Sequence, residues 1–182
     1  MSLRTLHLLG SPVLRQRADP VAGVDAAVRQ LIDDLFETMY AAKGVGLAAN
    51  QVGIAQRVAV VDTGGDTPEP LVLVNPTIVH RGEDTETAEE GCLSIPEIFG
   101  DVERPVAITV DATDRSGAPF RLEASGYQAR AIQHEIDHLD GILFLDHLSA
   151  VKRGLLLSKW KRLRKGETGY TKEVTPEPAG EL

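Results

Sequence analysis

The sequence has little of several features, and each scarcity excludes a class of protein. Its 182 residues contain one cysteine, Cys92, so no disulfide can form within the chain and a reducing compartment is expected. No stretch approaches the ~18 apolar residues of a membrane span, and the first residues lack a basic region followed by a long apolar core. We therefore expect a soluble, cytoplasmic protein that has no membrane partner.

Positive charge is also scarce over the chain as a whole. The formal net charge of −8 argues against a DNA-binding protein, because the phosphate backbone favours a basic surface. One segment near the C-terminus differs, since it carries basic residues with no acidic residue among them: Lys152, Arg153, Lys159, Lys161, Arg162, Arg164 and Lys165. This segment is either the solvated face of a terminal helix or a contact surface for RNA.

The hydrophobic patterns predict an α+β fold. Apolar residues recur at helical spacing from Asp25 to Lys43, with Asp25 as a suitable N-cap. From Arg57 to Leu122 the pattern changes to short apolar runs separated by Gly, Pro and Asp, which predicts a mostly antiparallel sheet. Helical spacing returns over residues 127–140 and again, more weakly, over 149–164. We expect the sheet to surround the helix at 127–140, with the other two helices at the N-terminal and C-terminal ends.

The chain is short enough to form one domain. No internal repeat or linker divides it, and 182 residues suffice for a single hydrophobic core. We expect this domain over residues 1–166. The remaining stretch, 167–182, contains Gly, Pro and Glu at short intervals and is expected to be a flexible tail.

Residues 134–138 read His-Glu-Ile-Asp-His and carry the strongest functional signal. On a helix, His134 and His138 lie on one face, where both rings can reach a metal ion, and Glu135 between them can act on a water molecule. The apolar stripe of the same helix lies on the opposite side. Together these features favour a metal-dependent hydrolase over two buried structural histidines.

A catalytic centre of this type has three protein ligands, so a third must come from elsewhere in the chain. The downstream candidates are Asp140, Asp146 and His147, but the first is too close along the helix and the others follow a glycine stop. Cys92 lies upstream in Glu-Gly-Cys-Leu-Ser. A lone cysteine is usually a buried inert residue, yet beside this motif a site of two histidines and one cysteine explains it better.

A third cluster, Gly44-Val45-Gly46-Leu47-Ala48-Ala49-Asn50-Gln51, follows the first expected helix. Taken alone it is a helix C-cap followed by a connection of small residues. It lacks the Lys-Ser/Thr ending of a phosphate-binding loop. Its glycines allow close backbone approach, and the amide of Gln51 can donate to a developing oxyanion.

Taken together, three motifs resemble those of the peptide deformylase family, in the same order along the chain. They are residues 44–51, residues 90–94 (Glu-Gly-Cys-Leu-Ser) and residues 133–139 (Gln-His-Glu-Ile-Asp-His-Leu). The opening Leu9–Arg15 also resembles the family, so the likeness covers about residues 3–165. It implies a hydrolase that removes the N-formyl group from the initiator methionine of new polypeptides and releases formate.

The resemblance also implies a role for each motif residue. Cys92, His134 and His138 are the expected metal ligands, and Glu135 is the expected general base and then general acid. These ligand types suit Zn, Fe(II), Co and Ni alike. The resemblance favours Fe(II) in the cell, with Zn, Ni or Co in purified protein.

Further assignments rest on the same resemblance. Gln51 and the backbone N–H of Leu93 are expected to form the oxyanion hole. Val45 and Gly46 are expected to present backbone groups to the peptide, and Glu90 to orient the loop that carries the cysteine.

An apolar pocket is expected to accept the methionine side chain. Its expected wall is formed by Val45, Ala131 and the stem of Arg130. Asn50 stands where many members have proline, and Glu97 replaces a common glycine at the rim of the cleft. The resemblance also implies ribosome contact through the basic C-terminal helix.

The motifs allow two other interpretations. A zinc peptidase uses the same helical motif, but its usual third ligand is a downstream Glu or His rather than an upstream cysteine. A structural metal site normally has four Cys or His ligands, and this chain has one cysteine and few spare histidines.

Overall fold

The computed structural model describes residues 2–65 and 69–176. The helices of this part are α1 (Ala26–Ala41), α2 (Gly126–Leu139) and α3 (Ala150–Leu163), with short 3-10 turns η1 (Pro12–Arg15), η2 (Ala49–Val52) and η3 (Phe144–His147). The strands are β1 (Leu6–His7), β2 (Gly46–Ala48), β3 (Val58–Val61), β4 (Leu71–Arg81), β5 (Thr85–Cys92), β6 (Ile95–Pro105), β7 (Ala107–Thr113), β8 (Pro119–Ser125) and β9 (Thr171–Lys172).

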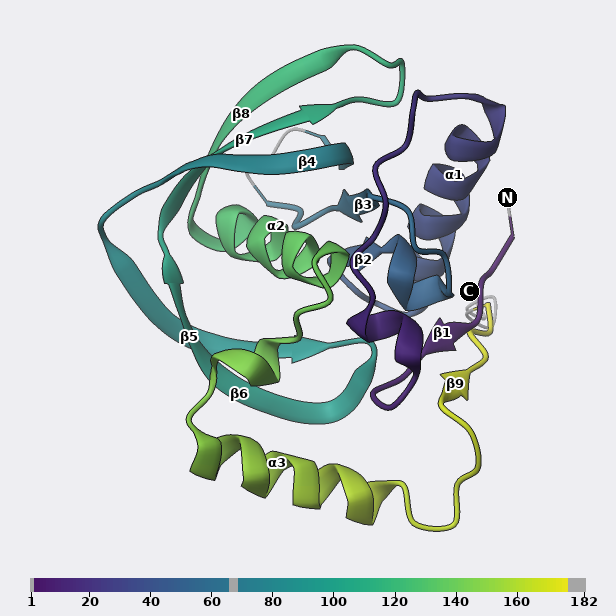
Figure 1. The fold of residues 1–182 in the computed structure, drawn as a ribbon, viewed down its shortest axis with the longest axis vertical. Coiled ribbons are helices and arrows are strands. Elements are labelled where there is room, and N and C mark those ends of the chain that lie inside the picture. The colour runs from purple at the N-terminus through teal and green to yellow at the C-terminus, as the bar shows by residue number, and fades with distance from the viewer. Residues whose placement is uncertain (1, 66–68, 177–182) are drawn as a thin grey trace, which may run out of the picture.

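The strands pair antiparallel and enclose α2. One sheet has the order β2-β3-β4-β7-β8, while β5 pairs with β6 and β1 pairs with β9. Helix α2 lies between the large sheet and the β5–β6 hairpin, and α3 lies on the outer side of that hairpin (Figure 1). This confirms the predicted α+β fold with a central helix. No helix in the described ranges is long and apolar enough to cross a bilayer.

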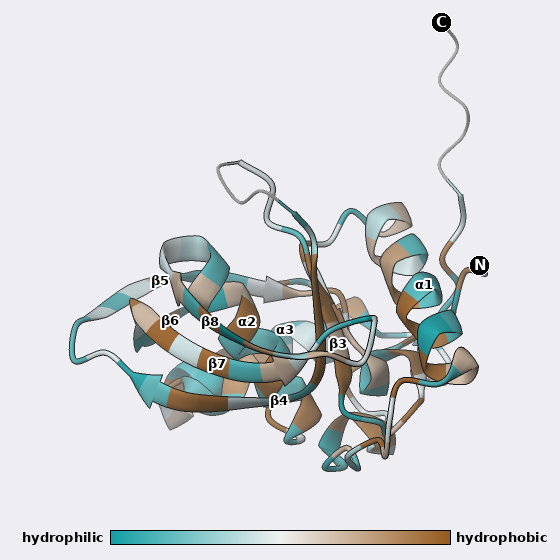
Figure 2. Ribbon diagram, turned by 90° about the horizontal axis from the view of Figure 1, so that it is seen from above, coloured by the Kyte–Doolittle hydropathy of each residue, from teal (hydrophilic) through white to brown (hydrophobic). Residues whose placement is uncertain are grey.

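Strand β3 separates two parts of the hydrophobic core. Successive side chains of a strand point to opposite faces, so the run Val58–Val61 can serve both. Ala59 and Val61 pack in the cluster that contains the apolar stripe of α2, whereas Val58 and Val60 pack in the cluster that contains α1. Figure 2 shows α1 and α2 on opposite sides of β3. A run that is apolar at every position is what a strand covered on both faces requires.

The helix predicted from Asp25 to Lys43 is confirmed as α1. The Asp25 carboxylate accepts a hydrogen bond of 2.9 Å from the Val28 backbone N–H, which satisfies one free donor of the first turn. The helix packs its buried face against the core and ends just before Gly44. Its end therefore places the glycine-rich segment 44–51 directly beside the core.

The buried side of α1 also anchors the N-terminal segment through Asp34. Its side chain is 1% exposed and accepts hydrogen bonds of 2.8 Å from the Ser2 backbone, the Arg4 guanidinium and the Gln30 amide. Burial by itself raises the pKa of Asp34, but the hydrogen bonds from Gln30, Ser2 and Arg4 outweigh it, and the net pKa is lowered. The ionised carboxylate is thus the form that the folded chain stabilises.

Replacing Asp34 by asparagine is expected to lower the free energy of unfolding by about 1–3 kcal/mol at pH 7. Because the pKa is lower in the folded state, this stabilisation is complete above the unfolded pKa of about 3.9 and is lost progressively as the pH falls from there through the lower pKa of the folded state. Denaturant unfolding at pH 7 and at pH 3 measures both effects. Asp33→Asn is the matched control, since Asp33 pairs with Arg115 at the surface, where such a pair is worth about 0–1 kcal/mol. Equal losses in the two variants would refute this account of Asp34.

The C-terminal segment differs from the expected flexible tail as far as it is described. After α3 the chain returns, and β9 pairs with β1 in the register Leu6↔Lys172 and His7↔Thr171 (Figure 1). Val174 packs against the core cluster that contains α1. These partners lie about 165 positions away along the sequence, so local composition could not reveal them. The end of the expected tail, 177–182, lies outside the described residues.

Candidate active site

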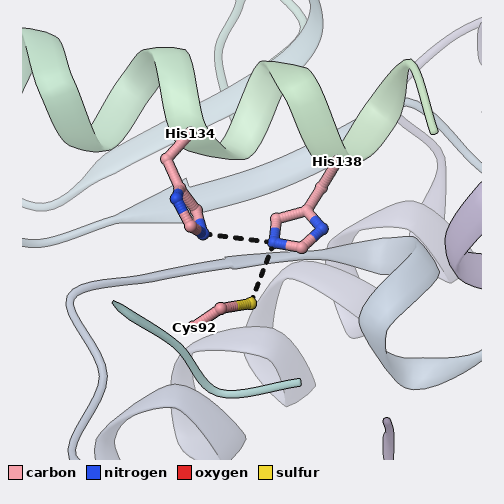
Figure 3. A group of neighbouring side chains, drawn as sticks. All are labelled: Cys92, His134 and His138. Atoms are coloured by element: carbon pink, nitrogen blue, oxygen red, sulfur yellow. Dashed lines mark hydrogen bonds between the residues drawn. The ribbon is translucent and has the colours of Figure 1, made fainter. Parts of the chain in front are cut away.

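Helix α2 places two histidines on the side away from its core-facing stripe. Ala129, Ile132, Ile136 and Leu139 pack in the hydrophobic core, as the helical spacing predicts. His134 and His138 project from the other side toward the β5–β6 hairpin, with their Nε2 atoms 3.2 Å apart (Figure 3). The i, i+4 spacing therefore directs both rings to one point.

Cys92 reaches the same point from the end of β5. The chain turns tightly there, because Cys92 pairs with Ile95, and the register then shifts so that Gly91 pairs with Phe99. Such a bulge re-aims the side chains beside it. The thiol Sγ lies 3.2 Å from Nε2 of His138 (Figure 3). The hairpin thus supplies the third ligand that α2 lacks.

The three side chains suit a divalent metal ion. Among the described residues, the ligand atoms of Cys92, His134 and His138 all lie within 4.8 Å of one another. Burial lowers the pKa of His138, and the charges of His134 and Arg104 lower it further, so the ring is neutral and able to bind a metal. Burial also opposes a charge on His134, but its hydrogen bonds to Cys92 and Glu90 outweigh burial and raise its pKa. Cys92 and Glu90 therefore favour positive charge at the His134 ring, while the His138 ring stays neutral.

Glu90 orients the first histidine and is itself held by two arginines. Its Oε1 lies 3.1 Å from Nδ1 of His134, which leaves Nε2 free to face the other ligands. Arg104 donates to both Glu90 oxygens, at 2.6 and 2.9 Å, and Arg130 donates to Oε2 at 2.7 Å. Burial raises the pKa of Glu90, but the hydrogen bonds from Arg104 and His134 lower it well below its usual range. Glu90 is therefore ionised throughout the neutral range.

Arg104 is a site residue that no sequence motif indicates. It is 4% exposed, and besides Glu90 it binds Asp137 of α2, with Nη1 2.9 Å from Oδ2. His147, one of the downstream ligand candidates, binds the same Asp137 oxygen at 2.8 Å instead of the metal site. Arg104 lies in a strand with no motif around it. A buried arginine joining two motifs that are far apart in sequence gives no local signal.

The Glu135 side chain packs against Gly46, and one of its carboxylate oxygens has no hydrogen-bond partner. A Cβ atom on Gly46 would come within 2.9 Å of Cγ and Cδ of Glu135, so only glycine leaves room for this side chain. Glu135 is 4% exposed, and its Oε2 has no hydrogen-bond partner. Burial raises the pKa of Glu135 to about 7, although the positive charges of His134 and Arg104 oppose the rise. A buried carboxylate with a free oxygen and a pKa near neutrality can exchange a proton with a reacting group.

Gln51 is fixed in one orientation beside the cysteine. Its Oε1 accepts from the Ala48 backbone N–H at 3.0 Å, so Nε2 must point the other way, toward Ser94 Oγ at 3.1 Å and Cys92 Sγ at 3.6 Å. The neighbouring Asn50 donates to the backbone carbonyl of His138 at 2.7 Å and so ties this segment to α2. Segment 44–51 is thereby held against both other motifs.

A cleft of about 620 Å³ brings the predicted site residues together. Its lining includes ten of them: Val45, Gly46, Gln51, Glu90, Cys92, Leu93, Arg130, Ala131, His134 and Glu135. His138 lies behind this wall and is 1% exposed. The guanidinium of Arg130 is bound to Glu90 and to the carbonyls of Val102 and Glu86 rather than to solvent. All three residues expected to form the methionine pocket, Val45, Arg130 and Ala131, line the cleft.

Two aromatic residues at this cleft were not predicted from the sequence. Phe99 and Tyr127 line it and are 55% and 60% exposed. Exposed aromatic side chains at the mouth of a cleft offer an apolar surface to a ligand. Tyr127 is placed by the start of α2, and Phe99 by the bulged strand β6 opposite Gly91.

Comparison with known proteins finds peptide deformylases along most of the chain. The sequence model described as "Polypeptide deformylase" matches residues 3–154. The peptide deformylase of Rhizobium meliloti is 46% identical over 167 residues, which are 91% of this chain and 96% of that protein. That of Brucella suis is 47% identical over 165 residues, which are 90% and 94% of the two chains.

Solved structures agree with the sequence relatives. The peptide deformylase of Ehrlichia chaffeensis in complex with actinonin superimposes with a TM-score of 0.86 at 37% identity, covering 92% of this chain and all of that one. The Synechococcus elongatus peptide deformylase, also in complex with actinonin, gives 0.80 at 46% identity and covers 85% of each chain. With its three motifs gathered at one cleft and with likeness of this extent, the chain belongs to the peptide deformylase family.

Proposed function

We propose that this chain removes the N-formyl group from the initiator methionine of newly made polypeptides, with Glu135 as the group that moves the proton. The observation that supports it most is the position of Glu135. Its free carboxylate oxygen is buried in the cleft beside a group of one thiol and two imidazoles. Cys92, His134 and His138 would hold one divalent metal ion, which when bound supplies Lewis acidity toward the formyl carbonyl and toward water.

Glu135 performs the proton transfers of the proposed reaction. Its carboxylate accepts a proton from water as the water oxygen bonds to the formyl carbon. When the C–N bond breaks, the same carboxyl group gives that proton to the leaving amine, and formate departs. A pKa near neutrality suits both steps, because neither form of the carboxyl group is then strongly favoured.

Gln51 and Leu93 are proposed to stabilise the negative charge that develops on the formyl oxygen. Nε2 of Gln51 carries two N–H groups and is held by the fixed orientation of the amide. Leu93 lies in the tight turn after Cys92 and also lines the cleft. Donors that are already in place need not reorganise during the reaction, and one such donor is typically worth about 10²–10³ in kcat.

The remaining residues are proposed to bind the peptide. Val45 and Gly46 lie where the glycine-rich segment meets the cleft, so a peptide backbone can approach them closely. The methionine side chain is assigned to the wall formed by Ala131 and the stem of Arg130. Glu90 supports this wall by binding the guanidinium of Arg130 at 2.7 Å.

The direct test is release of formate from formyl-Met-Ala-Ser by protein that is purified and loaded with metal without oxygen. Acetyl-Met-Ala-Ser is the control, because it has the same peptide but no formyl group. Formate from the first peptide and no acetate from the second is the expected result. A folded, metal-loaded protein that releases no formate would refute the proposed function.

Replacing Gly46 by alanine is expected to lower kcat by about 100-fold. The new methyl group would collide with the Glu135 side chain, and displacing a catalytic group by about 1 Å can cost that much. Gly154→Ala in α3 is the matched control, since a Cβ there meets no atom within 4 Å. The two variants are compared by formate release and thermal unfolding. Full activity in the Gly46 variant would show that Glu135 does not act from its observed position.

We further propose that Fe(II) is the metal used in the cell. One thiolate and two imidazoles also bind Zn, Co and Ni, so the choice of Fe(II) rests on the resemblance to the family and is tested by sensitivity to oxygen. Air oxidises Fe(II) and can oxidise a thiolate ligand such as Cys92. Activity of the native protein should therefore fade in air and persist without oxygen. Equal activity in both preparations at equal iron content would refute the assignment.

We place the reaction in the cytoplasm and propose that α3 contacts the ribosome, from which formylated chains emerge. The helix exposes a run of basic side chains around the buried Trp160. Arg164 is less available for a contact with RNA, because its guanidinium stacks on the rings of Trp160 and Tyr170. The exposed residues proposed for the contact are Lys159, Lys161 and Arg162.

Neutralising these three residues should weaken co-sedimentation with ribosomes and leave turnover of formyl-Met-Ala-Ser unchanged. The matched control removes three exposed charges elsewhere, at Arg17, Arg29 and Arg81. Each phosphate contact that is lost should also reduce the salt dependence of binding. Ribosome binding that is the same in both triple variants would refute a specific contact through α3.

A further inference from the structure

The returning C-terminal segment forms one wall of the catalytic cleft. Lys172, Glu173, Val174 and Thr175 line the same cavity as His134 and Glu135, and Leu6 of the paired strand β1 lines it too. The family match ends at residue 154, so these residues lie beyond the segment that the family model describes. They are a feature of this chain that the proposed catalytic mechanism does not use.

Several contacts hold this wall in place. The Leu8 backbone N–H donates to the Tyr170 carbonyl at 2.7 Å, and the Thr5 hydroxyl donates to Glu173 Oε1 at 2.9 Å. The Arg164 guanidinium lies 5.8 Å from the centre of the Tyr170 ring and also donates to the Gly169 carbonyl. Val174 packs against the core. The segment is therefore anchored on both sides of Lys172.

A second cavity lies beside the cleft and shares lining residues with it. It has a volume of about 320 Å³ and extends to Trp160 and Arg164 near the end of α3. Pro96, Glu97 and Lys172 line both cavities, so the junction lies between the bulge of β6 and strand β9. Glu97 holds a left-handed backbone conformation there, with φ +65°, which explains why glycine is the easier residue at this position.

The junction carries charges of both signs. Lys172 is exposed on β9, and Glu97 and Glu173 are exposed beside it in the lining of the cleft. A peptide held with its formyl group at Glu135 has to continue out of the cleft with the residues that follow methionine. Exposed charges at the rim of a binding site mainly determine which charged partners bind. They have little effect on the chemical step.

We propose that Lys172 and Glu173 bind the part of the peptide that follows the formyl-methionine, and thereby set the preference for charge at its third and fourth residues. This inference rests on the proposed deformylase function. Lys172 attracts acidic residues at these positions, and Glu173 attracts basic ones. Neither residue touches the reacting atoms, so their effect falls on KM for longer peptides and leaves kcat unchanged.

Two charge reversals test the proposal in the full-length, Fe(II)-loaded enzyme. The substrates are formyl-Met-Ala-Ser-Asp-amide, formyl-Met-Ala-Ser-Lys-amide and the short formyl-Met-Ala-amide. In Lys172→Glu, the ratio of kcat/KM for the Asp peptide to that for the Lys peptide should fall by about 3–10-fold, because the reversal turns a weak exposed attraction into a repulsion for the Asp peptide and does the opposite for the Lys peptide. Glu173→Lys should raise the same ratio. Both shifts should shrink in high salt.

The controls separate this proposal from the proposed function. Lys152→Glu makes the same charge change on α3, at an exposed position that lines neither cavity, and should leave the ratio unchanged. Turnover of formyl-Met-Ala-amide should stay within about two-fold in every variant. An unchanged ratio in Lys172→Glu and Glu173→Lys, with the short substrate still turned over, would overturn the wall as a specificity determinant. Failure of the wild-type enzyme on the short substrate would instead overturn the proposed function.

Discussion

Replacing Glu135 by glutamine is expected to lower kcat for formate release by about 10²–10⁴-fold, the usual contribution of a general acid–base group. Glutamine has nearly the same shape, so it can occupy the place over Gly46, but it cannot accept or return a proton. The residue is buried, and its Oε2 has no protein partner to lose. The variant should therefore keep its fold and its metal while it loses activity.

Formate release, metal content and thermal unfolding of the variant test this expectation together. Glu123→Gln is the matched control, because Glu123 lies exposed on β8 away from the cleft. It should retain wild-type activity. If Glu135→Gln released formate at a rate within ten-fold of the wild type, another group would have to move the proton.

Replacing Cys92 by serine is expected to weaken metal binding by more than about 100-fold and to abolish activity without added metal. A hydroxyl is a much poorer ligand than a thiolate, and even the partners of metal ligands are typically worth 10–100-fold in affinity or activity. Cys92 is the only cysteine in the sequence, so no other thiol can replace it. Its position at the end of β5 also means that the change leaves α2 intact.

Metal retained after dialysis against a chelator measures this loss. His80→Ala is a suitable control, since His80 lies exposed on β4 and outside the metal-binding group. It should retain as much metal as the wild type. A Cys92→Ser protein that kept one tightly bound metal ion would remove Cys92 from the ligand set and reopen the choice among the other acidic and histidine residues.

The sequence predicted the helices well, because their signals are local. The spacing of apolar residues and the cap at Asp25 placed α1 to within two residues at each end. The spacing in α2 also predicted which side faces the core, and therefore where His134 and His138 point. The run Val58–Val61 falls in the stretch from Arg57 to Leu122 that was predicted to form strands, but a continuous apolar run does not say which residue faces which helix.

The sequence predicted less about contacts between distant residues. Because the sequence has a single cysteine, few residues could be the third metal ligand, and Cys92 could be predicted. In contrast, nothing in the sequence near Arg104 indicates that this residue joins Glu90 to Asp137. The same limit explains the C-terminal segment. Its Gly, Pro and Glu content suggested a flexible tail, while its strand pairing depends on β1 at the other end of the chain. Composition indicates only the local structural preference of a segment. The contacts of Arg104 and the pairing of β9 depend on residues far away in the sequence.

The most direct test of the account is a titration of metal-free protein with Fe(II), without oxygen, in which formate release from formyl-Met-Ala-Ser is measured at each addition. If Cys92, His134 and His138 form the only catalytic metal site, activity should rise in proportion to added metal and stop rising at one equivalent per chain. Full activity before any metal is added would contradict the account, as would one bound metal per chain without release of formate.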